Sequence, residues 1–443
     1  MTSGILSRSK LLLSVLAIIG NSPMAFGAGY SLFEQGAKAT GMGGAFAATA
    51  DDPSAIFYNV AGIAYQRETK AMTGATWITF NAEFESDPLA DFPGGDPEAT
   101  IPGTGVREFY EDHNFVLPNT YLVIPIGKNS TFGIGQFTAF GLRTDWENRD
   151  SFSGRFISQD ANLKTVSIQP SFAMKSSSGK FALGVGIEYR GATVSLDRNV
   201  PGFNPFTNRF IDVAHVRLES DVDDDIGFNV GLLFAPNDDW RIGLSHRTAQ
   251  DIEFSGTATF TQIPTGNPQL DGIIGAGLPP NQPISLTLPF PSISHFGIAN
   301  TSVPDWTIEL DVVRMSWSRF DTLLAEFETT PAANLMVEEN WKDVFSYRIG
   351  AAREVSDNWD LYLGAVYDEN PQPTEAVSPI LPDSDRAGVS IGFGFEGDHW
   401  SLAVTEFYLK FQERSTEGRS QDNYNGTYNT FANLISFNVG YRF

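Results

Sequence analysis

Histidines are the side chains of this sequence best suited to act as general bases or metal ligands. Five are present, namely His113, His215, His246, His295 and His399. Ser245 precedes His246, but adjacent residues of a strand point to opposite faces, so these two side chains do not form a nucleophile–base pair. The sequence shows no metal-spaced set of His and Glu and no nucleophile elbow. We therefore predict that the chain is not an enzyme and has no catalytic residue, metal ligand or cofactor.

Two further segments resemble ligand-binding motifs but lack decisive residues. "DVDDD" at 221–225 has the charge for calcium, yet it lacks the spaced ligands and the glycine turn of an EF-hand loop. "GMGG" at 41–44 lacks the lysine of a P-loop. We interpret the acidic segment as a solvated rim and expect no nucleotide-driven step.

Other charged residues occur within segments of strict alternation, which is typical of β-strands. In "FALGVGIEYR" (181–190), Glu188 and Arg190 share one face with Gly184 and Gly186, while the opposite face is apolar. In "WTIELDV" (306–312), Glu309 and Asp311 oppose an apolar face in the same way. A soluble sandwich rarely sets glycines and unpartnered charges against a continuous apolar face. We expect these four charged side chains to pair across an interior.

The N-terminus predicts export. Arg8 and Lys10 precede the apolar run "LLLSVLAIIG", and the small residues Ala25 and Gly27 follow. This run is shorter than the roughly 20 residues needed to span a bilayer. Residues 1–27 are therefore predicted to be a signal peptide, cleaved before Ala28.

The composition of the mature chain excludes several classes. The formal net charge is −24, and loss of the two basic residues with the signal makes it −26. Such a charge argues against nucleic-acid binding, which requires basic faces. Cysteine is absent although export permits disulfides. A soluble exported β protein and an outer-membrane β-barrel remain as candidates.

The lengths of the connections favour the barrel. Short connections lie at 127–130, 176–180, 236–239, 300–305, 356–358 and 396–399, and they alternate with long ones at 86–115, 144–160, 197–214, 258–282, 321–340, 368–385 and 412–429. This parity predicts an all-β, transmembrane antiparallel barrel of about 14 strands, with tight turns at one end and long loops at the other.

The two ends of the mature chain fit this architecture. The alternating last segment, "NLISFNVGYRF" (433–443), is expected to pair with the first strand (73–84), because an open edge in lipid would leave backbone groups unsatisfied. Residues 28–68 lack alternation and are rich in Ala and Gly. Some 40 residues do not form an independent core. We predict that 28–68 is a plug, or hatch, inside the lumen of a barrel formed by 69–443, with a short helix over about 53–61.

The mature chain resembles the FadL family (OmpP1/FadL/TodX) of outer-membrane transporters for long-chain fatty acids and other hydrophobic compounds. The matching segments, in family order, are "AGY", "GMGGAFAATADDPSAIFYNVAG", "AFGLRTDW", "GRFISQDANLKTVSIQPS", "GFNVGLLFAPNDDWRIGLSHR", "LDVVRMSWSRFD", "NWKDVFSYRIG", "VYDENPQP" and "LPDSDR". The resemblance implies a 14-stranded barrel with an N-terminal hatch. It also implies localisation in the outer membrane of a Gram-negative bacterium.

The resemblance assigns roles to hatch residues. Ala28, Gly29 and Tyr30 are implied to reach an inner binding pocket. Asn59, Val60 and Ala61 occupy the position of the family's Asn-Pro-Ala, with valine in place of proline. Valine restores a backbone N–H and frees φ, so the rigid turn that proline supplies is absent.

The third strand shows a conflict of phase. Phe132 and Ile134 are expected to face lipid, but strict alternation then places Gln136 and Thr138 there as well, whereas the opposite phase exposes Phe137 and Ala139. A bulge or kink reconciles the two halves. In the family, a kink in this strand opens a lateral exit into the membrane. The residues assigned to it here are Gly135, Gln136, Phe137, Ala139, Phe140 and Gly141.

Two long outer loops are apolar, which is typical of a contact surface. The resemblance assigns them to a groove that captures the ligand. The residues concerned are Phe203, Phe206, Phe210, Ile211, Ile273, Ile274 and Leu278.

The predicted function is passive uptake of hydrophobic molecules, with long-chain fatty acids first and aromatic hydrocarbons as the alternative. A diffusion porin and an outer-membrane lipase are further alternatives, which conductance and phospholipid hydrolysis would reveal. The expected partners are the ligand, membrane lipid and the assembly machinery, which would recognise Phe443, and the expected state is a monomer. The sequence assigns no role to His246.

Overall fold

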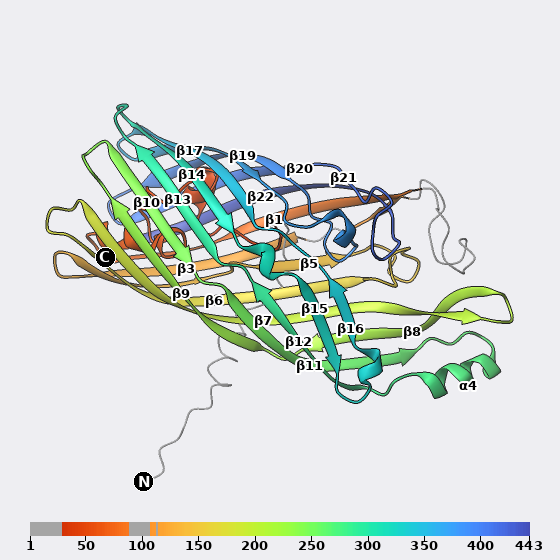
Figure 1. The fold of residues 1–443 in the computed structure, drawn as a ribbon. Helices are drawn as coiled ribbons and strands as arrows, with labels where there is room; N and C mark the ends of the chain where they lie inside the picture. Colours follow the sequence, from red (N-terminus) through yellow and green to blue (C-terminus); the bar gives the residue numbers. More distant parts are fainter. Residues whose placement is uncertain (1–28, 88–106, 112–113) are drawn as a thin grey trace, which may run out of the picture.

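The computed structural model describes residues 29–87, 107–111 and 114–443. The predicted signal peptide, Ala28 and His113 lie outside them. The strands form one antiparallel sheet that closes on itself (Figure 1). β1 (Lys70–Ser86) pairs along its whole length with β22 (Gly426–Arg442). The predicted pairing of the first strand with the last is thus confirmed, and the fold is a closed all-β barrel.

The wall contains 14 strands, as predicted. The continuous ones, besides β1 and β22, are β3 (Asn114–Ile126), β6 (Asp160–Lys175), β7 (Phe181–Asn204), β18 (Trp359–Asp368), β19 (Arg386–Glu396) and β20 (Trp400–Phe411). The others are each split in two: β4 (Ser130–Phe137) and β5 (Gly141–Asp145), β8 (Arg209–Ser220) and β9 (Asp223–Phe234), β10 (Trp240–Arg247) and β11 (Gln250–Gln262), β12 (Gln282–Phe290) and β13 (Ile293–Asn300), β14 (Trp306–Met315) and β15 (Thr322–Phe327), β16 (Leu335–Glu338) and β17 (Val344–Ser356).

Small elements complete the fold. In the connections these are β2 (Arg107–Phe109), β21 (Arg414–Ser415), α4 (Pro268–Gly277), η3 (Trp317–Arg319), η4 (Pro331–Ala333) and η5 (Thr374–Ala376). No helix in the described part of the chain is both long enough and apolar enough to cross a membrane.

The interruptions of neighbouring split strands lie opposite one another. Arg247 at the end of β10 pairs with Ile293 at the start of β13, and Ile293 pairs with Met315 at the end of β14. Beyond this level β8, β11, β12, β15 and β16 pair in that order and form what we call the outer sheet. In Figure 1 the outer sheet diverges toward α4, away from the end that holds the C-terminus.

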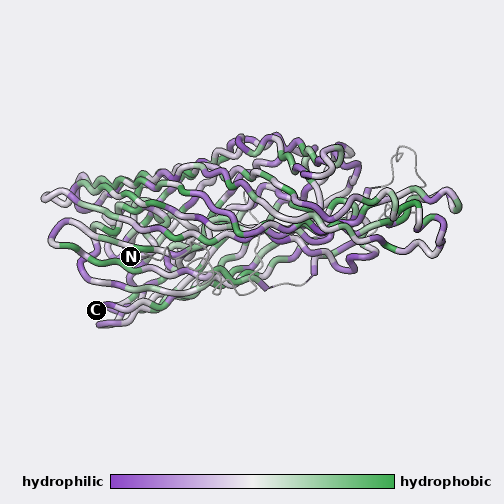
Figure 2. Tube along the Cα trace, turned by 90° about the horizontal axis from the view of Figure 1, so that it is seen from below, coloured by the Kyte–Doolittle hydropathy of each residue, from purple (hydrophilic) through white to green (hydrophobic). Residues whose placement is uncertain are grey.

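The outer surface of the wall changes character at the same level. Toward the C-terminal end, Phe181, Leu183, Val185 and Ile187 of β7 point outward and are exposed, whereas the residues between them are buried. Figure 2 shows apolar (green) and polar (purple) residues alternating along the strands. At the interruptions, exposed ion pairs replace the apolar surface, such as Arg319 with Asp251 at 2.6 Å. An apolar band with a polar border is the surface that a barrel presents to a membrane.

Residues 29–66, at the red end of the colour bar in Figure 1, lie inside the barrel and are almost entirely buried. They contain α2 (Ala37–Gly41), α3 (Ala55–Tyr58) and η1 (Val60–Tyr65). The helix expected over about 53–61 is shorter than predicted. It ends at Tyr58 because Asn59 is extended, with φ −154°.

Inward-facing glycines of the wall let the hatch backbone approach. A Cβ placed on Gly243 would lie 2.0 Å from the carbonyl oxygen of Ala47, and one on Gly184 would lie 2.6 Å from the nitrogen of Ala61. The glycine face that marked these strands in the sequence therefore accommodates the hatch.

Candidate functional site: a filled break in the wall and an apolar cavity

The third strand is interrupted between Phe137 and Gly141. β4 pairs with β3 as far as Gln136, opposite Thr120, and with β6 on its other edge. β5 pairs with β6 alone among the named strands. The ladder between the second and third strands therefore stops at the level of the predicted kink.

The side chains of the third strand do not change faces in the way that was predicted. Phe132 and Ile134 are exposed, and the alternation continues through half-buried Gln136. The predicted exposure of Phe137 and Ala139 in the second half is wrong, since both are buried. Phe137 turns inward because it packs against Phe57 of the hatch, with ring centroids 5.2 Å apart.

The N-terminal segment of the hatch fills this break. Leu32 N donates to the carbonyl of Ala139 at 2.9 Å, and Gly141 N donates to the carbonyl of Tyr30 at 2.9 Å. Ser31 and Phe140 form an antiparallel bridge between these two bonds. The hatch thus supplies hydrogen bonds that β3 does not give to the kinked strand.

The start of the described chain is held by a buried carboxylate. Gly29 N donates to Asp383 Oδ2 at 2.6 Å. Gly29 has φ +71°, and a Cβ there would lie 2.5 Å from the ring of Trp317, so this position requires glycine. Asp383 belongs to the connection between β18 and β19, and burial raises its pKa to about 7.

Tyr30 follows Gly29 and sits in an aromatic cluster. Its ring contacts those of Trp317 (4.6 Å between centroids), Phe320 (5.7 Å) and Trp341 (6.1 Å), while its hydroxyl donates to the carbonyl of Pro289 at 2.9 Å. Tyr30, Phe320 and Trp341 form one end of a cavity.

This cavity, which we call the outer cavity, has a volume of about 220 Å³. Tyr30, Phe320 and Trp341 bound it at one end. Its other walls are the outer sheet, the outer parts of β5, β6 and β7, and the connection between β18 and β19. Apolar side chains that line it include Leu142, Leu163, Val194, Leu196, Leu218, Phe254, Leu286, Leu288, Leu323, Val337, Ile380 and Leu381. A cavity with such an apolar lining suits a hydrophobic small molecule.

Comparison with known proteins decides the family. Residues 18–443 match the family described as outer membrane protein transport protein (OMPP1/FadL/TodX). The chain belongs to this family. It is accordingly an outer-membrane protein, as the sequence predicted.

Curated relatives of this FadL-family chain match it over nearly their whole length. A long-chain fatty acid transport protein of Escherichia coli is 26% identical, over 99% of this chain and 98% of the relative. Outer membrane protein P1 of Haemophilus influenzae is 24% identical, over 91% and 93% respectively.

Solved structures share the fold. A FadL homologue of Pseudomonas aeruginosa superimposes with a TM-score of 0.79 at 19% identity, covering 94% of this chain and 99% of that one. The toluene transporter TodX of Pseudomonas putida gives a TM-score of 0.67 at 16% identity, covering 93% and 98%.

The residues assigned to a capture groove lie at the outer end of this FadL-family barrel and do not line the outer cavity. The predicted loop at 197–214 is instead a hairpin of β7 and β8, in which Phe203 pairs with Phe210. The predicted loop at 258–282 contains the end of β11 and α4. The prediction of a loop at 197–214 is wrong because both strands continue beyond the apolar band, whereas residues 263–281 do connect β11 with β12 and contain α4.

The assigned groove residues differ in exposure. Phe203 and Phe206 of the hairpin and Ile273 of α4 are exposed. Phe210, Ile211, Ile274 and Leu278 are half-buried.

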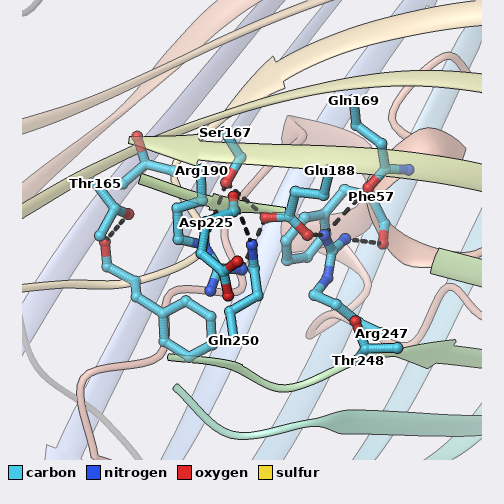
Figure 3. A network of polar contacts seen from close by, with 12 residues as sticks. Phe57, Thr165, Ser167, Gln169, Glu188, Arg190, Asp225, Arg247, Thr248 and Gln250 are labelled. Atoms are coloured by element: carbon cyan, nitrogen blue, oxygen red, sulfur yellow. Dashed lines mark hydrogen bonds and ion pairs between the residues drawn. The ribbon is translucent and has the colours of Figure 1, made fainter. Parts of the chain in front are cut away.

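Of the four charged residues predicted to pair across the interior, Glu188 and Arg190 pair as expected and the other two do not. Glu188 binds Arg190 at 2.7 Å and also contacts Arg247, as Figure 3 shows. Arg247 donates in turn to the carbonyl of Phe57 in the hatch at 3.2 Å. The network thereby joins the wall to the hatch.

Glu309 and Asp311 do not pair with cations across the lumen in the way predicted for them; they hold the hatch backbone. Asp311 accepts from the N–H groups of Phe46 and Ala47, and Glu309 from those of Ala48 and Thr49, at 2.6 to 3.0 Å. His295 Nε2 lies 2.7 Å from Asp311. Within the described residues no cluster of three potential ligands could hold a metal ion.

The segment Asn59-Val60-Ala61 is buried between hatch and wall. Asn59 Nδ2 donates to the carbonyls of Ala47 at 2.7 Å and Leu232 at 3.2 Å, and its Oδ1 accepts from Ala61 N at 3.2 Å. Asn59 thus joins two turns of the hatch to β9.

Sequence reasoning missed Asp383, Trp317 and Trp341 as site residues. All three lie in segments quoted for the family resemblance, "LPDSDR", "LDVVRMSWSRFD" and "NWKDVFSYRIG". The segments carried the signal, but one sequence does not show which of their residues meet the hatch.

Proposed function

We propose that this chain takes up hydrophobic molecules by passive diffusion across the outer membrane, with long-chain fatty acids as the first candidates. The observation that carries the proposal is that Tyr30, which closes the outer cavity, belongs to the segment that fills the break in the wall. Displacing one short segment therefore connects the cavity with the break.

The proposed route has three stages. A ligand is captured by the apolar residues of the β7–β8 hairpin and α4, enters the outer cavity, and displaces residues 29–32. It then leaves sideways into the membrane past residues 135–141. Burial of an acyl chain contributes roughly 0.8 kcal/mol per CH₂, so capture needs little polar chemistry.

A disulfide across the break tests this route. The chain has no cysteine, so Ser31→Cys with Phe140→Cys introduces a single pair at bridged positions. Antiparallel partners lie about 4.5–5.5 Å apart at Cα, within the range of a disulfide. Uptake of radiolabelled oleate by cells that depend on this protein should fall at least tenfold when the pair is oxidised.

Reduction of the same variant should restore uptake, and Ser31→Cys alone should remain active under oxidation. Equal uptake by the oxidised and reduced forms would overturn the lateral route. Comparison of oleate with toluene in the same assay decides between acyl-chain and aromatic substrates. Mass spectrometry of what co-purifies with the protein identifies the native ligand.

A general diffusion porin is the other candidate function. Against it stands the hatch, whose residues 29–66 fill the lumen and are bonded to the wall. We further propose that the protein is a monomer and that it interacts with membrane lipid and with the assembly machinery.

A further inference from the structure

The charged side chains that line the outer cavity are all acidic. Among its described lining residues, the charged ones are Glu219 and Glu339, and none is Lys, Arg or His. Glu219 is exposed and pairs with Arg217 at 3.0 Å, so its charge is partly balanced outside the cavity. Glu339 is the other charged lining residue, and Trp341, to which it is hydrogen-bonded, contacts the ring of Tyr30.

One of the two carboxylate oxygens of Glu339 accepts a hydrogen bond in the described part of the chain. Trp341 Nε1 donates to Glu339 Oε2 at 2.8 Å, and in the described chain it is the one hydrogen-bond donor to this carboxylate. Trp341 is itself buried against Phe320, with centroids 4.5 Å apart. The second oxygen of a fixed carboxylate is therefore free to accept from a molecule in the cavity.

The other charged groups near this point do not line the outer cavity. Arg190 lies 4.6 Å from the ring of Phe140, where it is bound to Glu188. Asp422 adds negative charge near Glu339, and the Tyr30 hydroxyl is engaged by Pro289. Burial raises the pKa of Glu339 to about 7.

We propose that the outer cavity selects hydrophobic molecules whose head is uncharged and donates a hydrogen bond, with Glu339 as the acceptor. A long-chain alcohol or the protonated form of a fatty acid has this chemistry. An ionised carboxylate lacks a donor and meets like charge without a counter-ion. This inference rests on the proposed function and narrows its substrate class.

Binding of 1-dodecanol and of dodecanoate at pH 9 tests the selection. Protein in lipid nanodiscs is titrated with each ligand, followed by tryptophan fluorescence, because Trp341 contacts the proposed acceptor. Empty nanodiscs give the partitioning of each ligand into lipid. We expect the alcohol to bind at least tenfold more tightly than the ionised acid.

Variants at neighbouring positions assign the effect to one carboxylate. Glu339→Gln should reduce the preference to about threefold or less, and Glu339→Lys should reverse it. Glu338→Gln is the matched control, because Glu338 is exposed and does not line the cavity; it should keep the wild-type preference. Heat-dependent migration on gels verifies that each barrel is folded.

Equal binding of the two ligands to the wild type, or a preference that Glu339→Gln leaves unchanged, would overturn the inference and leave the proposed function standing. If neither ligand binds above the empty nanodiscs, the outer cavity is not a ligand site. The proposed function then fails together with the inference.

Discussion

Asp383 connects the beginning of the hatch to the outer connections through the single bond that it accepts from Gly29. These two residues are far apart in the sequence. The bond can form only when the segment that fills the break, residues 29–32, is docked. Asp383 is therefore the residue through which docking can be altered without changing the wall.

We expect Asp383→Ala to loosen residues 29–32. Above pH 7, where the carboxyl is ionised, a hydrogen bond to this charged acceptor contributes roughly 1.5–3 kcal/mol, so backbone hydrogen exchange in this segment should accelerate at least tenfold. Asp383→Asn retains an acceptor and should stay nearer to wild type. Unchanged exchange in Asp383→Ala would show that the aromatic cluster alone holds Tyr30.

The same carboxyl should make stability depend on pH. Its pKa rises from an ordinary value of 3.8 to about 7 in the folded protein, because burial disfavours the charged form. Between these two values the folded state binds more protons than the unfolded state, so the contribution of Asp383 to stability falls as pH rises. Unfolding measured from pH 4 to 8 should show this slope in the wild type and a weaker slope in Asp383→Asn.

At the scale of elements, the hatch is bound to the wall mainly through its backbone. Four successive N–H groups, from Phe46 to Thr49, would lack partners in the lumen without the carboxylates of β14. A buried backbone donor without an acceptor is costly. Glu309 and Asp311 therefore select the docked hatch.

Replacing both carboxylates, as Glu309→Ala with Asp311→Ala, should release this part of the hatch and leave the barrel closed. In planar bilayers we expect the wild type to be closed to ions and the double variant to show conductance steps. Glu354→Ala, an exposed position of β17, is the control and should stay closed. Steady large conductance of the wild type would favour the porin, and a silent double variant would contradict the anchoring role.

At the scale of the whole molecule, the barrel depends on the last strand to close. Phe443 N donates to the carbonyl of Thr69 at 3.1 Å, while its side chain is exposed and contacts Tyr441, with centroids 4.9 Å apart. Its ring adds little to the interior, and we propose that Phe443 serves recognition by the assembly machinery.

Phe443→Ala should accordingly lower the amount of protein inserted in the outer membrane several-fold. The inserted fraction should keep the wild-type resistance to heat, because the seam between β1 and β22 is unaltered. Immunoblots of membrane fractions with and without heating measure both quantities. Normal insertion of Phe443→Ala would contradict recognition through this residue.

Sequence periodicity was informative wherever one face of a strand meets lipid. The alternation at 181–190 and the parity of the connections predicted the closed 14-stranded barrel, because lipid demands an apolar face and paired backbone groups. Beyond the apolar band neither demand applies. The outer end of β7 and parts of the outer sheet were therefore predicted to be loops.

The site was harder to predict because contacts distant in sequence define it. Phe137 turns inward because Phe57 of the hatch lies there, and Gly29 meets Asp383 across the barrel. Alternation describes a strand by itself and carries no information on what fills the lumen. The resemblance placed the hatch and the kink in the right segments, but it did not indicate Glu339 or the backbone contacts of Glu309.

The hatch precedes the strands in the sequence, yet it lies inside the barrel. The seam of this barrel is formed by the first strand, β1, and the last strand, β22. The hatch is hydrogen-bonded to both strands of this seam, since Ala37 N donates to Asn438 Oδ1 at 2.5 Å and Thr76 Oγ1 donates to the carbonyl of Glu34 at 2.9 Å. A change at the seam would therefore affect the binding of the hatch as well as the closure of the barrel. A fluorescent label or an affinity handle is therefore better placed at the exposed turn 237–239 between β9 and β10, which belongs neither to the hatch nor to the seam.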